Sequence, residues 1–288
     1  MRAVKRAALV HPTYVSVRTA AHFVRSRCLA SPELPGGVEV IAHRGASSAA
    51  PENTLASIEL AWAMGANAVE VDVHLSADHR IVAIHDTSTK RTGRTDLEVA
   101  TTPARRLRCL DVGRHKHRRF AGERIPFLEE VLATIPSGRR LFIEVKCGAH
   151  VLPLLKRVVT CAGKRHQIAV IGFALDTVKT AKTLMPDVPT YWLCDTSLWK
   201  PFDRRVVDEA RRSGLDGLDA RWFGITPHFV RAVKAAGLEL YTWTVNDPAV
   251  AAWLGALGVE GVTTNYPDRL GCPRSAGTLA TRRATKRA

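Results

Sequence analysis

The sequence predicts an α/β protein built as a (β/α)8 barrel, with a small insertion after a hairpin at the second strand. Short apolar runs alternate with helical patterns from residue 38 to residue 270, and such alternation is typical of a parallel sheet. The 288 residues, 46% of them hydrophobic, suffice for one large barrel domain or two ordinary ones. We count nine strand-like runs, one more than a barrel of this type needs.

The first predicted strand, 38–42, is followed by a helix that Asn53 or Thr54 caps and that ends at Met64. The second strand spans 67–73. The later barrel strands are predicted at 141–146, 168–173, 190–193, 217–219, 238–245 and 261–264. Helices are predicted between the strands at 126–134, 177–184, 203–213, 227–236 and 248–257.

An antiparallel hairpin accounts for the extra strand, 81–85. Only five residues, 76–80, separate it from the apolar run that ends at Leu75, whereas a parallel crossover needs about a dozen or more. The run therefore returns antiparallel to the second strand, with Leu75 opposite Ile81. The same register places Val71 opposite His85, so this histidine is expected beside the polar residues of the second strand.

Two carboxylates alternate on the second strand. Glu70 and Asp72 lie two residues apart, so both point to one face of the sheet. Burying both without a cation is costly, because each unpaired charge loses its hydration. One interpretation is an exposed edge with solvated acids. The stronger one is a divalent cation with Glu144 as third ligand, and oxygen ligation favours Mg²⁺ or Ca²⁺ over zinc.

Two histidines stand at strand ends close to these carboxylates. A lone histidine there is more often structural, but His43 and His85 converge on one site and suit proton transfer near neutral pH. Cleavage of a phosphodiester needs a base for the attacking oxygen and an acid for the leaving alkoxide. Arg44 and Lys146 add positive charge for phosphate oxygens, with surface salt bridges as their alternative role.

The formal charge of +15 is confined to three segments. Residues 1–27, 105–119 and 271–288 carry 18 of the 42 Lys and Arg residues and one of the 27 acidic residues. The remainder, with 24 basic and 26 acidic residues, has a formal charge of −2, which disfavours a nucleic-acid partner. Segment 105–119 instead suggests a peripheral contact with anionic membrane lipids, against the plainer alternative of a solvated charged loop.

The termini are predicted to flank one domain that spans 38–270. Residues 1–37 form a basic extension without an uninterrupted apolar stretch, so we expect neither a secretory signal nor a transmembrane helix. The expected location is therefore the cytoplasm. An interfacial helix or an organelle-type presequence is the alternative. Residues 271–288 form a basic tail for which disorder is expected. The six cysteines have no CxxC spacing, which favours reduced thiols.

The polar residues form motifs that resemble the signature of the glycerophosphodiester phosphodiesterase family, within the PLC-like phosphodiesterase superfamily. In chain order the motifs are His43-Arg44-Gly45, Pro51-Glu52-Asn53-Thr54, Glu70-x-Asp72, His85-Asp86 with Arg91-Thr92-Gly93, Ile125-Pro126-x-Leu128-Glu129-Glu130, Glu144-Val145-Lys146, Phe173, Trp243-Thr244-Val245-Asn246, and the run from Gly258 to Asp268. Each motif is short, but their order and spacing together are specific.

The resemblance implies a TIM barrel that hydrolyses glycerophosphodiesters to sn-glycerol 3-phosphate and an alcohol. It implies one divalent cation, Mg²⁺ or Ca²⁺, with Mn²⁺ as a third candidate. Carried over residue by residue, His43 and His85 are the general acid/base pair. Glu70, Asp72 and Glu144 are the metal ligands.

The substrate contacts also follow from the resemblance. Arg44 and Lys146 are expected to grip the phosphate. Phe173 and Trp243 are expected to wall the pocket beside the glycerol or the head group, with a place in the core as the alternative for the tryptophan. The inserted segment, about 87–123, is expected to cap the barrel mouth.

Two departures from the family pattern are visible. Asn265 stands where the family usually has an aspartate, and Gly172 stands where a serine is common. Neither departure is expected to touch a metal ligand or a catalytic histidine. Both are therefore expected to affect details of the substrate pocket only.

Two other functions remain as alternatives. A lysophospholipase D that acts on lysophospholipids would use the same residues. A protein of a different class, a non-catalytic barrel that binds nucleic acid or membranes through its basic segments, would not need them.

Overall fold

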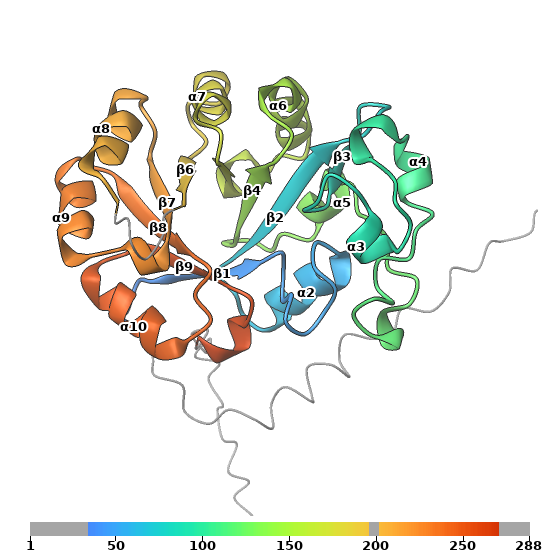
Figure 1. Ribbon diagram of the computed structural model, residues 1–288, viewed down its shortest axis with the longest axis horizontal. Coiled ribbons are helices and arrows are strands. Elements are labelled where there is room, and N and C mark those ends of the chain that lie inside the picture. Colours follow the sequence, from blue (N-terminus) through green and yellow to red (C-terminus); the bar gives the residue numbers. More distant parts are fainter. Residues whose placement is uncertain (1–33, 196–201, 271–288) are drawn as a thin grey trace, which may run out of the picture.

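Eight parallel strands close into a barrel in the computed structural model, which describes residues 34–195 and 202–270 (Figure 1). The strand β1 (Glu39–His43) pairs with β9 (Gly261–Thr264) on one side and with β2 (Ala68–Leu75) on the other, which closes the sheet. The other barrel strands are β4 (Arg140–Val145), β5 (Ile168–Gly172), β6 (Thr190–Cys194), β7 (Gly217–Arg221) and β8 (Glu239–Trp243). The predicted (β/α)8 barrel is therefore confirmed.

Helices surround the barrel on its outer side (Figure 1). They are α2 (Leu55–Ala63), α5 (Leu128–Ala133), α6 (Leu152–Cys161), α7 (Leu175–Leu184), α8 (Arg204–Arg212), α9 (Pro227–Ala235) and α10 (Pro248–Leu257). Thr54 is the cap of α2, because its side chain accepts a hydrogen bond from the backbone N–H of Ser57. The helices predicted from the sequence do not include α6, although the buried side chains of this helix, Leu152, Leu155 and Val159, recur at helical spacing.

The extra strand, β3 (Ile81–Ala83), pairs antiparallel with β2 in the predicted register and lies outside the closed barrel. The predicted pair of His85 with Val71 is not part of this ladder, whose last pair is Val73 with Ala83. The strand ends at Ala83, whose N–H donates to the carbonyl of Pro126 at 2.9 Å. The chain that returns from the insertion pairs with the other edge of β3. On the β2 side, the N–H of Ile84 still donates to the carbonyl of Asp72 at 3.0 Å, so the hairpin pairing reaches the residue before the histidine.

An aromatic layer fills the amino-terminal half of the barrel. The ring of Phe142 stacks on Tyr191 at 5.9 Å and meets Tyr241 edge-on at 5.2 Å between ring centres. Arg140 seals this end of the barrel by donating hydrogen bonds to the Tyr241 hydroxyl at 3.1 Å and to Glu39 at 3.2 Å. This layer closes the amino-terminal end of the barrel, so the cavity lies at the carboxyl-terminal end, where sites form in such barrels.

The insertion, 87–123, packs against the loop that follows β1. Lys116 donates from Nζ to the carbonyl of Ser47 at 2.7 Å, and Arg119 donates to the carbonyl of Ala49 at 3.0 Å. The insertion contains two short α-helices, α3 (Lys90–Gly93) and α4 (Ala104–Leu107). Part of its positive charge therefore holds the insertion against the loop that carries Arg44.

None of the helices within 34–195 and 202–270 is long and apolar enough to cross a bilayer. Four cysteines in this part of the chain are free thiols, as expected: Cys109, Cys147, Cys161 and Cys194. Most of the predicted basic extension and all of the predicted C-terminal tail lie outside the described residues.

Candidate active site

A cavity of about 300 Å³ opens at the carboxyl-terminal end of the barrel strands. Its wall includes eight of the nine predicted site residues: His43, Arg44, Glu70, His85, Glu144, Lys146, Phe173 and Trp243. The ninth, Asp72, is fully buried and forms ion pairs with two of them, Arg44 and Lys146. The remaining lining residues are Ile171, Leu193, Asp219, Arg221, Thr244 and Thr263.

Three carboxylates from two adjacent strands converge beside this cavity. Glu70 and Asp72 lie on β2, and Asp72 is opposite Glu144 of β4 in the sheet register. One oxygen atom from each residue lies within 4.8 Å of the others. All three side chains are buried, so the predicted cluster exists and the alternative of a solvated edge is wrong.

The electrostatics of this cluster fit a bound cation. Burial raises the pKa of Glu70 well above its usual value, and the negative charges of Asp72 and Glu144 raise it further. Burial and the charge of Asp72 raise the pKa of Glu144 to about 7. Oε1 of Glu70 and Oδ1 of Asp72 accept no hydrogen bond. A buried set of oxygen ligands with unsatisfied acceptors suits Mg²⁺ or Ca²⁺.

Two basic side chains flank the carboxylates. Nε of Arg44 lies 3.1 Å from Oδ2 of Asp72, and Nζ of Lys146 lies 2.7 Å from Oε1 of Glu144. Burial alone would raise the pKa of Asp72, but the positive charges of Arg44, His85 and Lys146 outweigh it and lower this pKa. Both basic groups also line the cavity, where they can meet an anionic ligand.

A tight turn places Arg44 in this position. Arg44 has a φ of 57°, and its backbone N–H donates to Oε2 of Glu70 at 2.9 Å. The next residue, Gly45, has a φ of 78°, and a Cβ at this position would lie 2.5 Å from the backbone of Ser57. Only glycine fits here, which explains the His-Arg-Gly order physically.

His43 is held by Asn265, and this contact corrects an expectation. Nδ1 of His43 donates to Oδ1 of Asn265 at 2.7 Å, although this asparagine was expected to stay clear of both histidines. The reason is the register of β1 and β9, in which Ala42 lies opposite Thr264. The next residue of each strand therefore reaches the same place at the cavity edge.

The environment of His43 keeps its imidazole neutral. Burial lowers the pKa of His43 to about 4, and the positive charge of Arg44 contributes to this shift. Because Nδ1 carries the proton donated to Asn265, Nε2 carries the lone pair. That Nε2 atom lies 4.0 Å from Oε2 of Glu70, so the basic nitrogen faces the carboxylate cluster.

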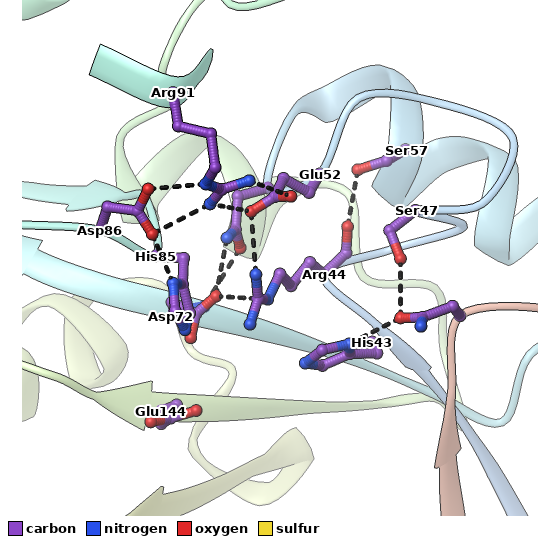
Figure 2. Close-up of polar contacts among 12 residues, drawn as sticks. His43, Arg44, Ser47, Glu52, Ser57, Asp72, His85, Asp86, Arg91 and Glu144 are labelled. Atoms are coloured by element: carbon purple, nitrogen blue, oxygen red, sulfur yellow. Dashed lines mark hydrogen bonds and ion pairs between the residues drawn. The ribbon is translucent and has the colours of Figure 1, made fainter. Parts of the chain in front are cut away.

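His85 is connected to Arg44 through a chain of charged side chains (Figure 2). Nδ1 of His85 donates to Asp86 at 2.7 Å, and Asp86 accepts from Nε of Arg91 at 2.7 Å. Arg91 reaches on to Glu52 at 2.8 Å, and Glu52 accepts from Arg44 at 2.9 Å. The insertion thus supplies a residue that links the loops carrying the predicted catalytic and phosphate-binding groups.

Aromatic side chains form the outer wall of the cavity. The rings of Phe173 and Trp243 meet edge-on with 5.5 Å between their centres, and Phe173 is 44% exposed. Nε1 of Trp243 donates to the carbonyl of Asp219 at 3.1 Å. The guanidinium of Arg221 lies 4.9 Å from the centre of the Trp243 ring. The tryptophan therefore lines the cavity, and it also packs against the aromatic layer inside the barrel.

A match to the glycerophosphoryl diester phosphodiesterase family spans residues 43–269, which contain every residue of the site. The chain belongs to this family. A candidate glycerophosphodiester phosphodiesterase from Bacillus subtilis is 33% identical over 232 residues, which are 80% of this chain and 95% of that protein. The glycerophosphodiester phosphodiesterase of Caldanaerobacter subterraneus is 31% identical over 236 residues, with 80% and 95% covered.

Solved structures of glycerophosphodiester phosphodiesterases and related enzymes share the fold. A phosphodiesterase from Oleispira antarctica, solved in complex with the product sn-glycerol-3-phosphate, is 30% identical with a TM-score of 0.73, and 82% of this chain and 95% of that chain are covered. The motif resemblance that the sequence predicts is therefore confirmed at the level of the family.

Several polar residues of this family member have contacts that sequence reasoning missed. Glu52, Asn53 and Arg91 belong to the quoted motifs, so their importance was visible but their partners were not. Asn265 was visible only as a departure from the family pattern. Asp219 carried no signal, because it is the last residue of a short predicted strand.

Proposed function

We propose that this protein hydrolyses glycerophosphodiesters to sn-glycerol 3-phosphate and an alcohol, with His43 and His85 as the general acid/base pair. The observation that carries the proposal is the convergence of two imidazoles, three carboxylates and two basic side chains on one cavity. Phosphodiester cleavage needs groups of these kinds, because protons must move and negative charge on phosphate must be neutralised.

His43 is suited to accept the proton of the attacking oxygen. Its pKa of about 4 keeps the ring unprotonated at neutral pH. The hydrogen bond from Nδ1 to Asn265 fixes the tautomer, so that Nε2 is the acceptor. A base must have its lone pair free when the substrate arrives, and this arrangement provides it.

His85 is suited to protonate the leaving alkoxide. Nδ1 of His85 donates to the carboxylate of Asp86 at 2.7 Å. Arg91 holds this carboxylate with two further hydrogen bonds. The other ring nitrogen is then available to give up a proton, and the orientation of the ring is set by the carboxylate.

Arg44 and Lys146 are suited to bind the phosphate oxygens. Both line the cavity and both are already held by buried carboxylates, so little side-chain freedom is lost on binding. Glu70, Asp72 and Glu144 would hold a divalent cation, which supplies Lewis-acid stabilisation of phosphoryl charge and orients the glycerol hydroxyls when bound. Phe173 and Trp243 complete the wall on the substrate side.

The test is release of sn-glycerol 3-phosphate from glycerophosphocholine, with and without a chelator. We expect His43→Ala to lower the rate by about 100- to 10,000-fold. His228→Ala, on the exposed side of α9, is the matched control and should have wild-type activity. The proposal fails if neither Mg²⁺, Ca²⁺ nor Mn²⁺ supports release above the level of the His43 variant.

The lysophospholipase D alternative is separated by a second substrate. Lysophosphatidylcholine has the head group of glycerophosphocholine and adds an acyl chain. Phe173 and Trp253 are the exposed large apolar side chains of the described residues, and this is little surface for an acyl chain. We therefore expect a higher kcat/KM for the deacylated substrate. A higher value for the lysolipid would favour the alternative.

A further inference from the structure

Asp219 lies in the cavity and has no role in the chemistry described above. It is on β7, where Leu193 of β6 and Tyr241 of β8 are its neighbours in the sheet register. Its side chain is 1% exposed, and it lines the cavity. Its Oδ1 atom is buried without a hydrogen-bond partner.

The fold gives this Oδ1 atom no hydrogen-bond partner among the described residues. The nearest cation along the strand, Arg221, pairs with Asp195 at 2.9 Å instead. The lining residues Ile171 and Leu193 are apolar. Buried polar groups in folded proteins are nearly always hydrogen-bonded, so an unpartnered carboxyl that faces a cavity indicates a missing ligand.

The chemistry of the cavity narrows the ligand group to a hydroxyl. Burial, together with the negative charge of Glu144, raises the pKa of Asp219 well above its usual value. A neutral carboxyl group can both donate and accept a hydrogen bond. Cationic ligands are disfavoured, because Arg221 and Lys146 already lie over the rings of Trp243 and Phe173.

The glycerol half of the substrate supplies such hydroxyls. Asp219 comes from β7, away from the strands β2 and β4 that carry the three carboxylates. If one hydroxyl of the glycerol unit faces the three carboxylates, the other hydroxyl can face the opposite wall of the cavity, to which β7 contributes. The carboxyl group of Asp219 belongs to that wall, and its Oδ1 atom has no hydrogen-bond partner.

We propose that Asp219 is a specificity-determining residue that hydrogen-bonds a hydroxyl of the glycerol half of the substrate. This inference rests on the proposed function for the identity of the ligand. In this role Asp219 recognises the glycerol part of the substrate and takes no part in proton transfer.

Calorimetric binding tests the inference without catalysis. The protein, in Ca²⁺, is titrated with sn-glycerol 3-phosphate and with n-propyl phosphate, which has the same carbon chain and no hydroxyl. Asp219→Leu removes the hydrogen bond at similar volume, and Asp219→Asn keeps a neutral donor and acceptor. The preference is the ratio of the Kd for n-propyl phosphate to the Kd for sn-glycerol 3-phosphate. We expect this ratio to fall roughly ten-fold in the leucine variant, the magnitude of one hydrogen bond, and to stay unchanged in the asparagine variant.

The outcomes separate the inference from the proposed function. A wild-type preference that persists in the leucine variant overturns the inference, and so does equal weakening of both ligands or loss of the preference in both variants. Equal affinity of the wild type for both phosphates also overturns it. If the leucine variant does not fold, Asp219→Ala makes the same comparison. Absence of diester hydrolysis, with the binding pattern intact, contradicts only the proposed function.

Discussion

Asn53 and Asp72 exchange two hydrogen bonds across the site. Nδ2 of Asn53 donates to Oδ2 of Asp72 at 2.8 Å, and the backbone N–H of Asp72 donates back to Oδ1 of Asn53 at 3.1 Å. Asn53 has a φ of 56°, a conformation that asparagine tolerates better than most residues. The loop after β1 is thereby attached to a predicted metal ligand, and its orientation depends on this asparagine.

The first prediction concerns this pair. Asn53→Gly removes the side chain without backbone strain, so Asp72 loses both hydrogen bonds that orient it. We expect the affinity for Ca²⁺ to fall about ten- to one-hundred-fold, as for other residues that orient a ligand, measured by calorimetry. Asn67→Ala is the control, because the side chain of Asn67 accepts a hydrogen bond from the backbone N–H of Val40, and this contact lies outside the site. A Ca²⁺ affinity unchanged by Asn53→Gly would contradict the prediction.

The second prediction is that cation binding releases protons. Burial raises the pKa of Glu144 to about 7 and raises that of Glu70 as well, and a cation must displace those protons. Affinity for Mg²⁺ or Ca²⁺ should therefore rise from pH 6 to pH 8. Calorimetry in buffers of different ionisation enthalpy counts the protons. Binding at pH 6.5 without proton release would show that the carboxylates are already ionised.

The third prediction concerns the stability that Glu52 provides. Although burial opposes it, hydrogen bonds from Arg91 and the charge of Arg44 lower the pKa of Glu52 from 4.5 to about 2. A lowered pKa contributes stability that is present above pH 4.5 and is lost as the pH falls toward 2. Glu52→Gln should lower the free energy of unfolding at pH 7 by about 2 kcal/mol, allowing for solvent screening.

Urea unfolding at pH 7, 4 and 3 measures this effect. The difference between the wild type and the Glu52 variant should shrink as the pH falls. Glu129→Gln is the control, because the ion pair of Glu129 with Arg80 is nearly half exposed on both sides and such pairs contribute little. A difference that stays constant from pH 7 to pH 3 would rule out the charge of Glu52 as its cause.

The fourth prediction concerns Arg91. Arg91→Lys keeps the positive charge but cannot bridge Glu52 and Asp86 with a planar fork. We expect kcat for glycerophosphocholine to fall about ten-fold while KM changes less, because His85 loses its orientation. Arg94→Lys, one turn along the same segment, is the control. A change in KM alone would assign Arg91 to substrate binding instead.

The fifth prediction concerns the basic segment 105–119. Some of its charges are used internally, but Arg105, Arg106 and Arg118 are exposed. We expect more protein to sediment with anionic vesicles than with neutral ones, and less at high salt. Replacing these three arginines by glutamine should remove the difference. Equal sedimentation with both kinds of vesicle would contradict this prediction and favour the alternative, a solvated charged loop.

The barrel and most of its site were predictable because the signals are local. Alternation on one strand places Glu70 and Asp72 on one face whatever the rest of the chain does. The short spacing before Ile81 demands a hairpin. These rules depend on backbone geometry alone, and the structure follows them.

The contacts that were missed depend on which strand ends are neighbours in space. Asn265 meets His43 because the barrel closes between β9 and β1, and no local pattern carries this register. The hydrogen bond from Ala83 of β3 to Pro126 has the same origin, since it joins the hairpin to a segment from beyond the insertion. Such contacts appear only when the three-dimensional arrangement is known.

The chain of charges from His85 through Asp86, Arg91 and Glu52 to Arg44 has a consequence for protein engineering. A segment inserted between barrel elements is usually treated as an exchangeable module. Here Arg91 joins two loops of the site, so grafting a different insertion would also remove a brace of the reacting groups. Any chimaera that replaces this insertion has to restore an arginine at this position before its substrate preference can be interpreted.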